Sequence, residues 1–138
     1  MDYNQFLYSP IDKMVQRVTD LAETLELYAP IVYGSDPPEN GICMIQNAGY
    51  PAETHFDKGY IFQLPVLLNG KHADQYTVLG TLTSIHELLT KRLSYADLSD
   101  EQIQVINIET TSLPAIIGRE QNNQWICGSS FNISFYWR

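Results

Sequence analysis

The segment from His86 to Thr90 begins like a helical zinc site. In that motif two His one turn apart hold the metal, and the Glu that follows the first His activates water. Here Glu87 follows His86, but Thr90 stands where the second His is required. One imidazole does not make a zinc site, so we interpret His86 as a helix-face residue packed beside Leu82 and Leu89.

A second group of candidate ligands lies in an irregular stretch that we expect over residues 47–58. Glu53, His55 and Asp57 alternate there, and oxygen and imidazole groups on one side of a loop are able to hold a cation. Local hydrogen bonding is the commoner use of such side chains in loops. We therefore expect no metal there.

Other reactive constellations are missing from the sequence. Ser129 and Ser130 follow Gly128 in an expected strand, without the Gly-x-Ser-x-Gly elbow or a helix behind it. The early glycines are spread over separate turns and form no phosphate-binding loop; they are Gly34, Gly41, Gly49, Gly59 and Gly70. We expect no enzyme, catalytic site, cofactor or metal.

Two loops and one turn carry residues suited to contacts with other chains. The stretches over residues 36–40 and 50–58 are longer and richer in Pro and Gly than hairpin turns need to be. Arg119 and Glu120 fit either an interface ion pair or a solvated turn. The candidate interface residues are Asp36, Glu39, Tyr50, Glu53, His55, Asp57, Arg119 and Glu120.

Two amphipathic helices are predicted. The first spans residues 10–27, because Ser9 suits a cap, Pro10 the first turn and Asp12 the positive end of the dipole. An apolar group that precedes it either docks on a neighbouring subunit or packs on its own domain; the group is Tyr3, Phe6, Leu7 and Tyr8. The second helix spans residues 73–93.

The first three predicted strands lie between these helices. Residues 30–33 form a short strand, and residues 42–45, apolar on both faces, form a central one. The third begins at Gly59 and alternates over residues 60–69. Pro65 has no amide hydrogen, so it is expected at an edge or a bulge.

Two more strands follow the second helix. Residues 102–109 form one, with a bulge or burial of both faces where apolar parity shifts between Val105 and Ile106, and residues 113–115 end it. Residues 121–124 turn the chain into a long strand from Trp125 to Trp137 with one aromatic face. We expect Phe131 on that face, beneath the second helix.

These elements predict an α+β fold, in which a mostly antiparallel sheet of four to five strands packs on two amphipathic helices. At 138 residues the chain is expected to form a single domain, 1–138. Cys43 and Cys127 lie in apolar runs and are expected to be buried thiols.

Composition limits the partners. Sixteen acidic and eight basic residues give a net charge of −8, which opposes binding to nucleic-acid phosphates. The first residues lack the pattern of a signal peptide, and no apolar run approaches the length of a membrane span. We expect a soluble protein that is not exported.

The order of these segments resembles the small minor capsid or tail terminator (head-tail joining) proteins of tailed bacteriophages. The resemblance covers nearly the whole chain and depends on order and spacing. Its pieces are the N-terminal helix, a short strand and polar loop, residues 49–51 and 57–59, a strand carrying Gln63, Asp74-Gln75 opening a long helix, residues 106–114, Gly118, and the aromatic terminal strand. Residues 94–101 match no motif.

The resemblance implies a virion protein at the junction of tail and head, made in the host cytoplasm. It implies a ring, usually a hexamer, that ends the tail tube and presents a surface to the head connector. The partners are then a second copy, the tail tube protein and the connector, with DNA passing through the lumen and no membrane contact.

Two alternatives stay open. One is a head-side completion protein. The other, from a different class, is a small-ligand-binding or regulatory α+β module with Tyr50, His55 and Asp57 around a pocket.

Overall fold

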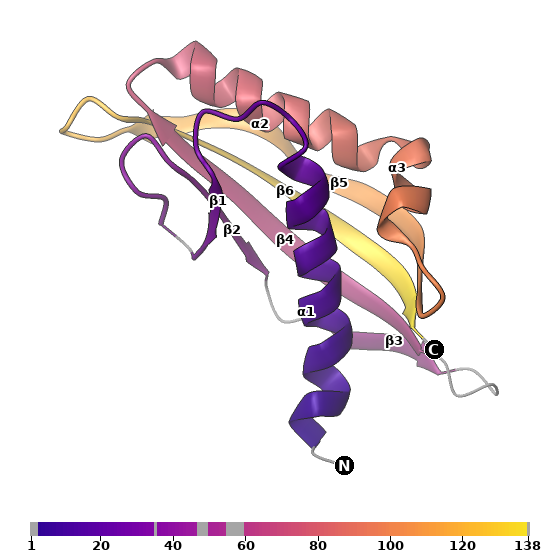
Figure 1. Ribbon diagram of the computed structural model, residues 1–138. Coiled ribbons are helices and arrows are strands. Elements are labelled where there is room, and N and C mark those ends of the chain that lie inside the picture. The colour runs from indigo at the N-terminus through magenta and orange to yellow at the C-terminus, as the bar shows by residue number, and fades with distance from the viewer. Residues whose placement is uncertain (1–2, 35, 47–49, 55–59, 138) are drawn as a thin grey trace.

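The computed structural model describes residues 3–34, 36–46, 50–54 and 60–137, and for residues 3–10, 46, 50–54 and 60 it describes the backbone. The elements in chain order are α1 (Tyr3–Ala22), β1 (Ile31–Tyr33), β2 (Ile42–Gln46), β3 (Tyr50–Thr54), β4 (Tyr60–His72), α2 (Gln75–Thr90), α3 (Arg92–Leu98), β5 (Ile103–Arg119) and β6 (Trp125–Trp137) (Figure 1).

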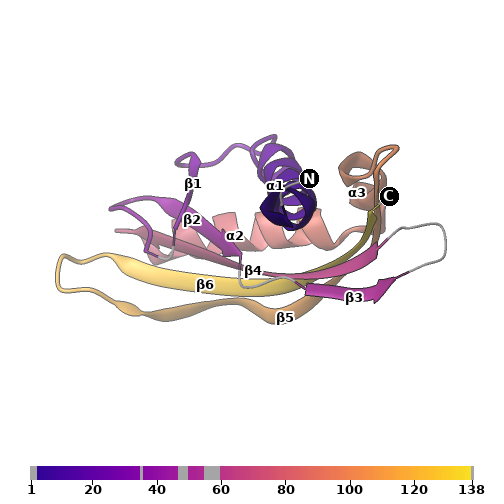
Figure 2. The same ribbon diagram turned by 90° about the horizontal axis from the view of Figure 1, so that it is seen from below.

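The strands form one sheet in the order β1-β2-β4-β6-β5, and β3 also pairs with β4. β1 and β2 are parallel, and the other pairs are antiparallel. All three helices lie on the same face of the sheet, and no described element covers the other face (Figure 2). The α+β prediction is confirmed. The predicted numbers of strands and helices were low, because β3 lies in the stretch expected to be irregular and α3 follows the second helix.

The core fills the space between the helices and the sheet. Phe131 and Phe135 of β6 are fully buried there, in one cluster with Leu82 and Leu89 of α2. The ring of Phe135 stacks on that of Phe62 with centroids 5.4 Å apart. The aromatic face of β6 therefore packs beneath α2, as the alternation predicts.

Strand β5 runs without a break through Pro114, which the sequence analysis places at its end. Its register against β6 shifts at four points, one of them between Val105 and Asn107, where a bulge is predicted. The strand tolerates Pro114 because β5 lies at the edge of the sheet and, among the described strands, pairs with β6 alone. A missing amide hydrogen on its outer side therefore breaks no hydrogen bond to another strand.

Pro65 lies in β4, inside the sheet, where it pairs with Asn132 of β6. On the other side of β4, β3 pairs up to Gln63 and β2 pairs from Val66. In the described pairings, Pro65 thus faces the gap between these two strands. β4 is nevertheless a central strand with a regular register against β6, so the predicted edge or bulge at Pro65 is not confirmed.

Helix α1 begins at Tyr3 and ends at Ala22, so the predicted bounds of 10 and 27 were wrong. Ser9 and Pro10 lie inside it. One proline inside a helix removes one backbone hydrogen bond, while the apolar spacing from Leu7 onward continues the stripe. The apolar group at residues 3–8 belongs to this helix, and its side chains lie outside the described residues.

The long second helix is divided in two. Asp74 caps α2, and its carboxylate accepts hydrogen bonds from the Tyr76 amide (3.3 Å) and the Thr77 hydroxyl (2.7 Å). Lys91 is extended (φ −70°, ψ 133°) and ends it. The Ser94 hydroxyl then donates to the Leu88 carbonyl (2.6 Å), which α2 leaves unpaired, and α3 follows.

Two smaller expectations concern the cysteines and membranes. Cys43 and Cys127 are both free and fully buried, as predicted. Among the described residues, none of the helices combines the length and apolarity that a membrane span requires.

Candidate subunit interface

Two of the predicted interface residues meet at a buried cation. Lys71, at the end of β4, is 6% exposed, and its Nζ lies 2.8 Å from an Asp36 carboxylate oxygen and 2.7 Å from one of Glu120. Asp36 comes from the β1–β2 loop and Glu120 from the β5–β6 turn. Lys71 therefore links two loops that are distant in sequence through ion pairs to both.

The environment of Lys71 keeps it charged. The hydrogen bond to Asp36, followed by the one to Glu120, raises the pKa of Lys71 above 10.5, and burial acts in the opposite direction. A raised lysine pKa means that the pair contributes its full stability at neutral pH and loses it in strongly alkaline solution. Lys71 therefore keeps its charge, and its ion pairs with Asp36 and Glu120, at neutral pH.

Other contacts hold the same loops together. The buried Gln124 side chain accepts a hydrogen bond from the Asn40 amide (2.9 Å), and Asn40 in turn accepts one from the Ala73 amide (3.3 Å). Arg119 donates to Asn123 (2.8 Å) and lies over the Trp125 ring, 5.1 Å from its centroid. We call this group, residues 36–40, 71–73 and 119–124, the loop end.

Six of the eight predicted interface residues lie in the part of the chain that the structure describes, and they are divided between two ends of the sheet. Asp36, Glu39, Arg119 and Glu120 gather at the loop end. Tyr50 and Glu53 lie on β3, which pairs with the opposite end of β4. The side chains of Tyr50 and Glu53, and all of His55 and Asp57, lie outside the described residues.

The sequence analysis missed an exposed apolar segment on β5. Leu113, Ile116 and Ile117 are 69%, 41% and 67% exposed, and we call these three residues the apolar arm. They lie in the second half of β5, which is the edge strand of the sheet. The signal was present, because residues 110–118 contain no charge. The assumption that Pro114 ends the strand concealed it.

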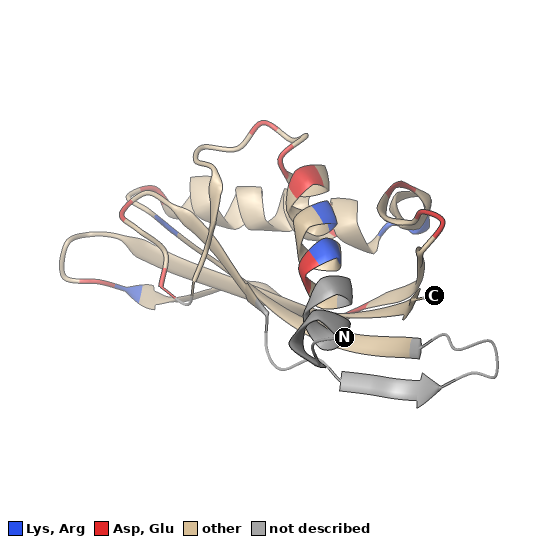
Figure 3. Cartoon of the chain, turned by 60° about the horizontal axis from the view of Figure 1, so that its bottom comes forward, with Lys and Arg blue, Asp and Glu red and all other residues tan. Residues whose placement is uncertain are grey.

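The helix-free face of the sheet is polar at its centre. The Gln63 side-chain oxygen accepts hydrogen bonds from the Asn132 amide (2.6 Å) and the Ser134 hydroxyl (2.8 Å), and the hydroxyls of Thr111 and Ser130 are 2.7 Å apart. Most charged side chains lie on helices and loops, while the long strands are mostly uncharged (Figure 3). This face can meet water or a polar partner.

His86 is a structural residue. It is buried on α2, its Nε2 lies 2.7 Å from the Thr110 hydroxyl of β5, and its ring packs edge-on against Phe131. Burial lowers the pKa of His86 below 6.5, and Glu87 opposes this only weakly. Among the described residues, no three His, Cys, Asp or Glu side chains are grouped to hold a metal.

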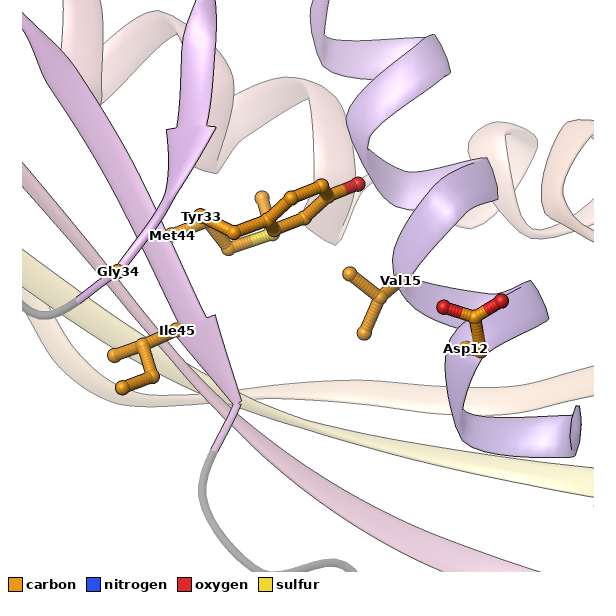
Figure 4. Close-up of a pocket in the computed structure, with 6 residues that line it drawn as sticks. All are labelled: Asp12, Val15, Tyr33, Gly34, Met44 and Ile45. Atoms are coloured by element: carbon orange, nitrogen blue, oxygen red, sulfur yellow. The ribbon is translucent and has the colours of Figure 1, made fainter. Parts of the chain in front are cut away.

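A cavity of about 420 Å³ opens between α1 and strands β1 and β2 (Figure 4). Among the described residues, its lining includes the apolar side chains of Val15, Met44 and Ile45, the ring of Tyr33 and the carboxylate of Asp12. The Tyr33 hydroxyl lies 3.0 Å from that of Thr19 on α1. Val15, Met44 and Ile45 give the cavity apolar walls that suit an apolar side chain.

Comparison with known proteins gives a likeness of fold. No protein-family model matches the chain, and no curated protein matches it. Among solved structures, a chain of the "Virion of native gene transfer agent (GTA) particle" superposes with a TM-score of 0.53. The match covers 91% of this chain and 93% of that one, at 12% sequence identity. The two chains therefore share a fold over nearly their whole length.

Proposed function

We propose that this protein is a structural component of a phage-like virion, and that it ends the tail as a terminator ring subunit. The observation that carries the proposal is the end-to-end fold likeness to a chain of a gene transfer agent virion. The order of sequence segments points to the same class independently, because that resemblance needs no structure. A virion subunit performs assembly, so it requires no catalytic group.

The shape of the molecule supports a ring. A ring needs two different surfaces on each subunit, one that meets the preceding copy and one that meets the next. The apolar arm lies on the β5 edge, and the exposed residues Val32 and Tyr33 lie on the β1 edge. We propose a hexamer whose lumen lets DNA pass, since an acidic chain does not retain phosphates.

The proposed partners are the tail tube protein on one side and the head connector on the other. The loop end and the β3 end are at opposite ends of the long strands (Figure 2). They therefore offer one surface to each partner. In this role the protein works at the tail-head junction of the virion and is made in the host cytoplasm.

A head-side completion protein is the second candidate, because the fold likeness supports a virion component of either kind equally. The ligand-binding module depends on Tyr50, His55 and Asp57, whose side chains lie outside the described residues.

Deletion of the gene and electron microscopy of the resulting particles test the proposal. A terminator mutant should give filled heads and separate tails, many of them overlong, and a plasmid copy should restore joined particles. Tails of normal length with heads that leak DNA would favour the completion protein. Unchanged particles would rule out both virion roles.

A further inference from the structure

The apolar arm has the properties of a covered surface. Natural sheets usually protect an exposed edge with charges, proline or bulges. β5 carries Pro114 and four register shifts against β6, features that disfavour pairing with a further strand. Its side chains are uncharged over residues 110–118 and apolar over residues 113–117, although the chain has a net charge of −8. Side-chain packing, rather than a backbone ladder, is the contact that this edge allows.

The opposite edge of the sheet offers a matching surface. Residues 30–34 at β1 are also uncharged, and Val32 and Tyr33 are 40% and 55% exposed there. The cavity in Figure 4 lies beside Tyr33, which is part of its wall. A hydrophobic patch that fits a pocket elsewhere on the same molecule produces head-to-tail contacts.

We propose that the apolar arm of one copy packs against the β1 edge and the adjacent cavity of a second copy. Charge favours this pairing, because two chains of net charge −8 repel each other, whereas residues 110–118 and residues 30–34 carry no charge. The inference rests on the proposed ring and adds which two surfaces meet. The arm and the cavity lie on different edges, so the contact repeats and closes into a ring where the rotation fits.

Cysteine cross-linking between two variants tests this contact. Leu113→Cys and Val32→Cys are purified separately, mixed in concentrated solution and treated with a short bismaleimide. A covalent dimer should form in the mixture and in neither variant alone. Cys43 and Cys127 are fully buried and should not react. Leu93→Cys is the matched control, because Leu93 is 86% exposed but lies on α3; mixed with Val32→Cys, it should give no dimer.

Each other result overturns the proposal. A dimer in Leu113→Cys alone would mean that two β5 edges meet symmetrically, and no dimer in the mixture would mean that the two surfaces do not meet. Adding Ile117→Asp to the Leu113→Cys chain should abolish the mixed dimer while its circular dichroism spectrum stays unchanged. The deletion phenotype is a separate readout, so a terminator phenotype without cross-linking would leave the function standing and refute the contact.

Discussion

Lys71 is the residue on which the loop end depends. Lys71→Met should lower the free energy of unfolding by about 1–3 kcal/mol, because a buried cation and two ion pairs are lost while the carboxylates regain water. Urea unfolding measures the change. Arg119→Met is the control: it removes the same charge from an exposed neighbour and should cost less than about 1 kcal/mol. If both variants lost the same free energy of unfolding, the buried ion pairs of Lys71 would contribute no more than an exposed charge does.

His86 should make stability depend on pH. Burial lowers its folded pKa below 6.5, so the unfolded chain takes up the proton first and stability falls as the pH drops through 6.5. His86→Gln keeps a polar group near Thr110 and removes the titration. Urea unfolding at several pH values between 7.5 and 5 should show a smaller loss of stability in the variant; parallel curves would contradict the assignment.

At the scale of elements, β6 and α2 together form the centre of the core. Phe131→Ala should cost roughly 3–5 kcal/mol, because it opens a cavity where the side chain is fully buried against α2. Phe131→Leu, which retains most of the volume, should cost much less. Thermal melting of both variants provides the comparison, and an Ala variant that melts like the wild type would disprove the face assignment.

The apolar arm is held in place partly by a glycine. A Cβ on Gly128 would lie 2.6 Å from Cδ1 of Ile117 and 2.7 Å from the Asn69 side-chain oxygen. Gly128→Ala should therefore displace Ile117 and cost about 1 kcal/mol. Gly118→Ala, in the same hairpin, meets nothing within 4 Å and should be nearly neutral. Urea unfolding that ranks the two in the reverse order would refute this packing.

Regular patterns predicted the elements that depend on local sequence. The alternation from Trp125 to Trp137 predicted β6, and the parity shift at Val105 predicted a bulge. Prolines were misleading at Pro10 and Pro114, since the cost of a missing amide hydrogen depends on whether a partner strand or turn needs it. Whether such a partner is present depends on the tertiary structure, which the local sequence pattern does not contain.

The candidate site was predictable in part for the same reason. Asp36 and Glu120 stood out as charged loop residues, but their meeting at Lys71 joins three segments far apart in sequence. No spacing rule connects such segments. The apolar arm was visible as an uncharged run, but its exposure follows from the position of β5 at the edge of the sheet.

At the scale of the whole molecule, we expect stability to come from this single core without a metal. EDTA should leave the melting temperature unchanged. A structural metal contributes folding free energy directly, so its removal would lower the melting temperature. Dialysis followed by elemental analysis is the companion measurement. Stoichiometric zinc, or a large drop in melting temperature, would contradict this expectation and direct attention to His55 and His86.

The position of β6 also has a consequence for how the chain acquires its structure. β6 lies between β4 and β5, and Tyr60 pairs with Trp137 across most of the sequence. During synthesis, one hydrogen-bonding edge of β4 must therefore stay unpaired until residues 125–137 have left the ribosome. Contacts of such long sequence separation slow folding to milliseconds or longer. The nascent chain is then a natural client for a chaperone, and removal of the last strand should leave it insoluble.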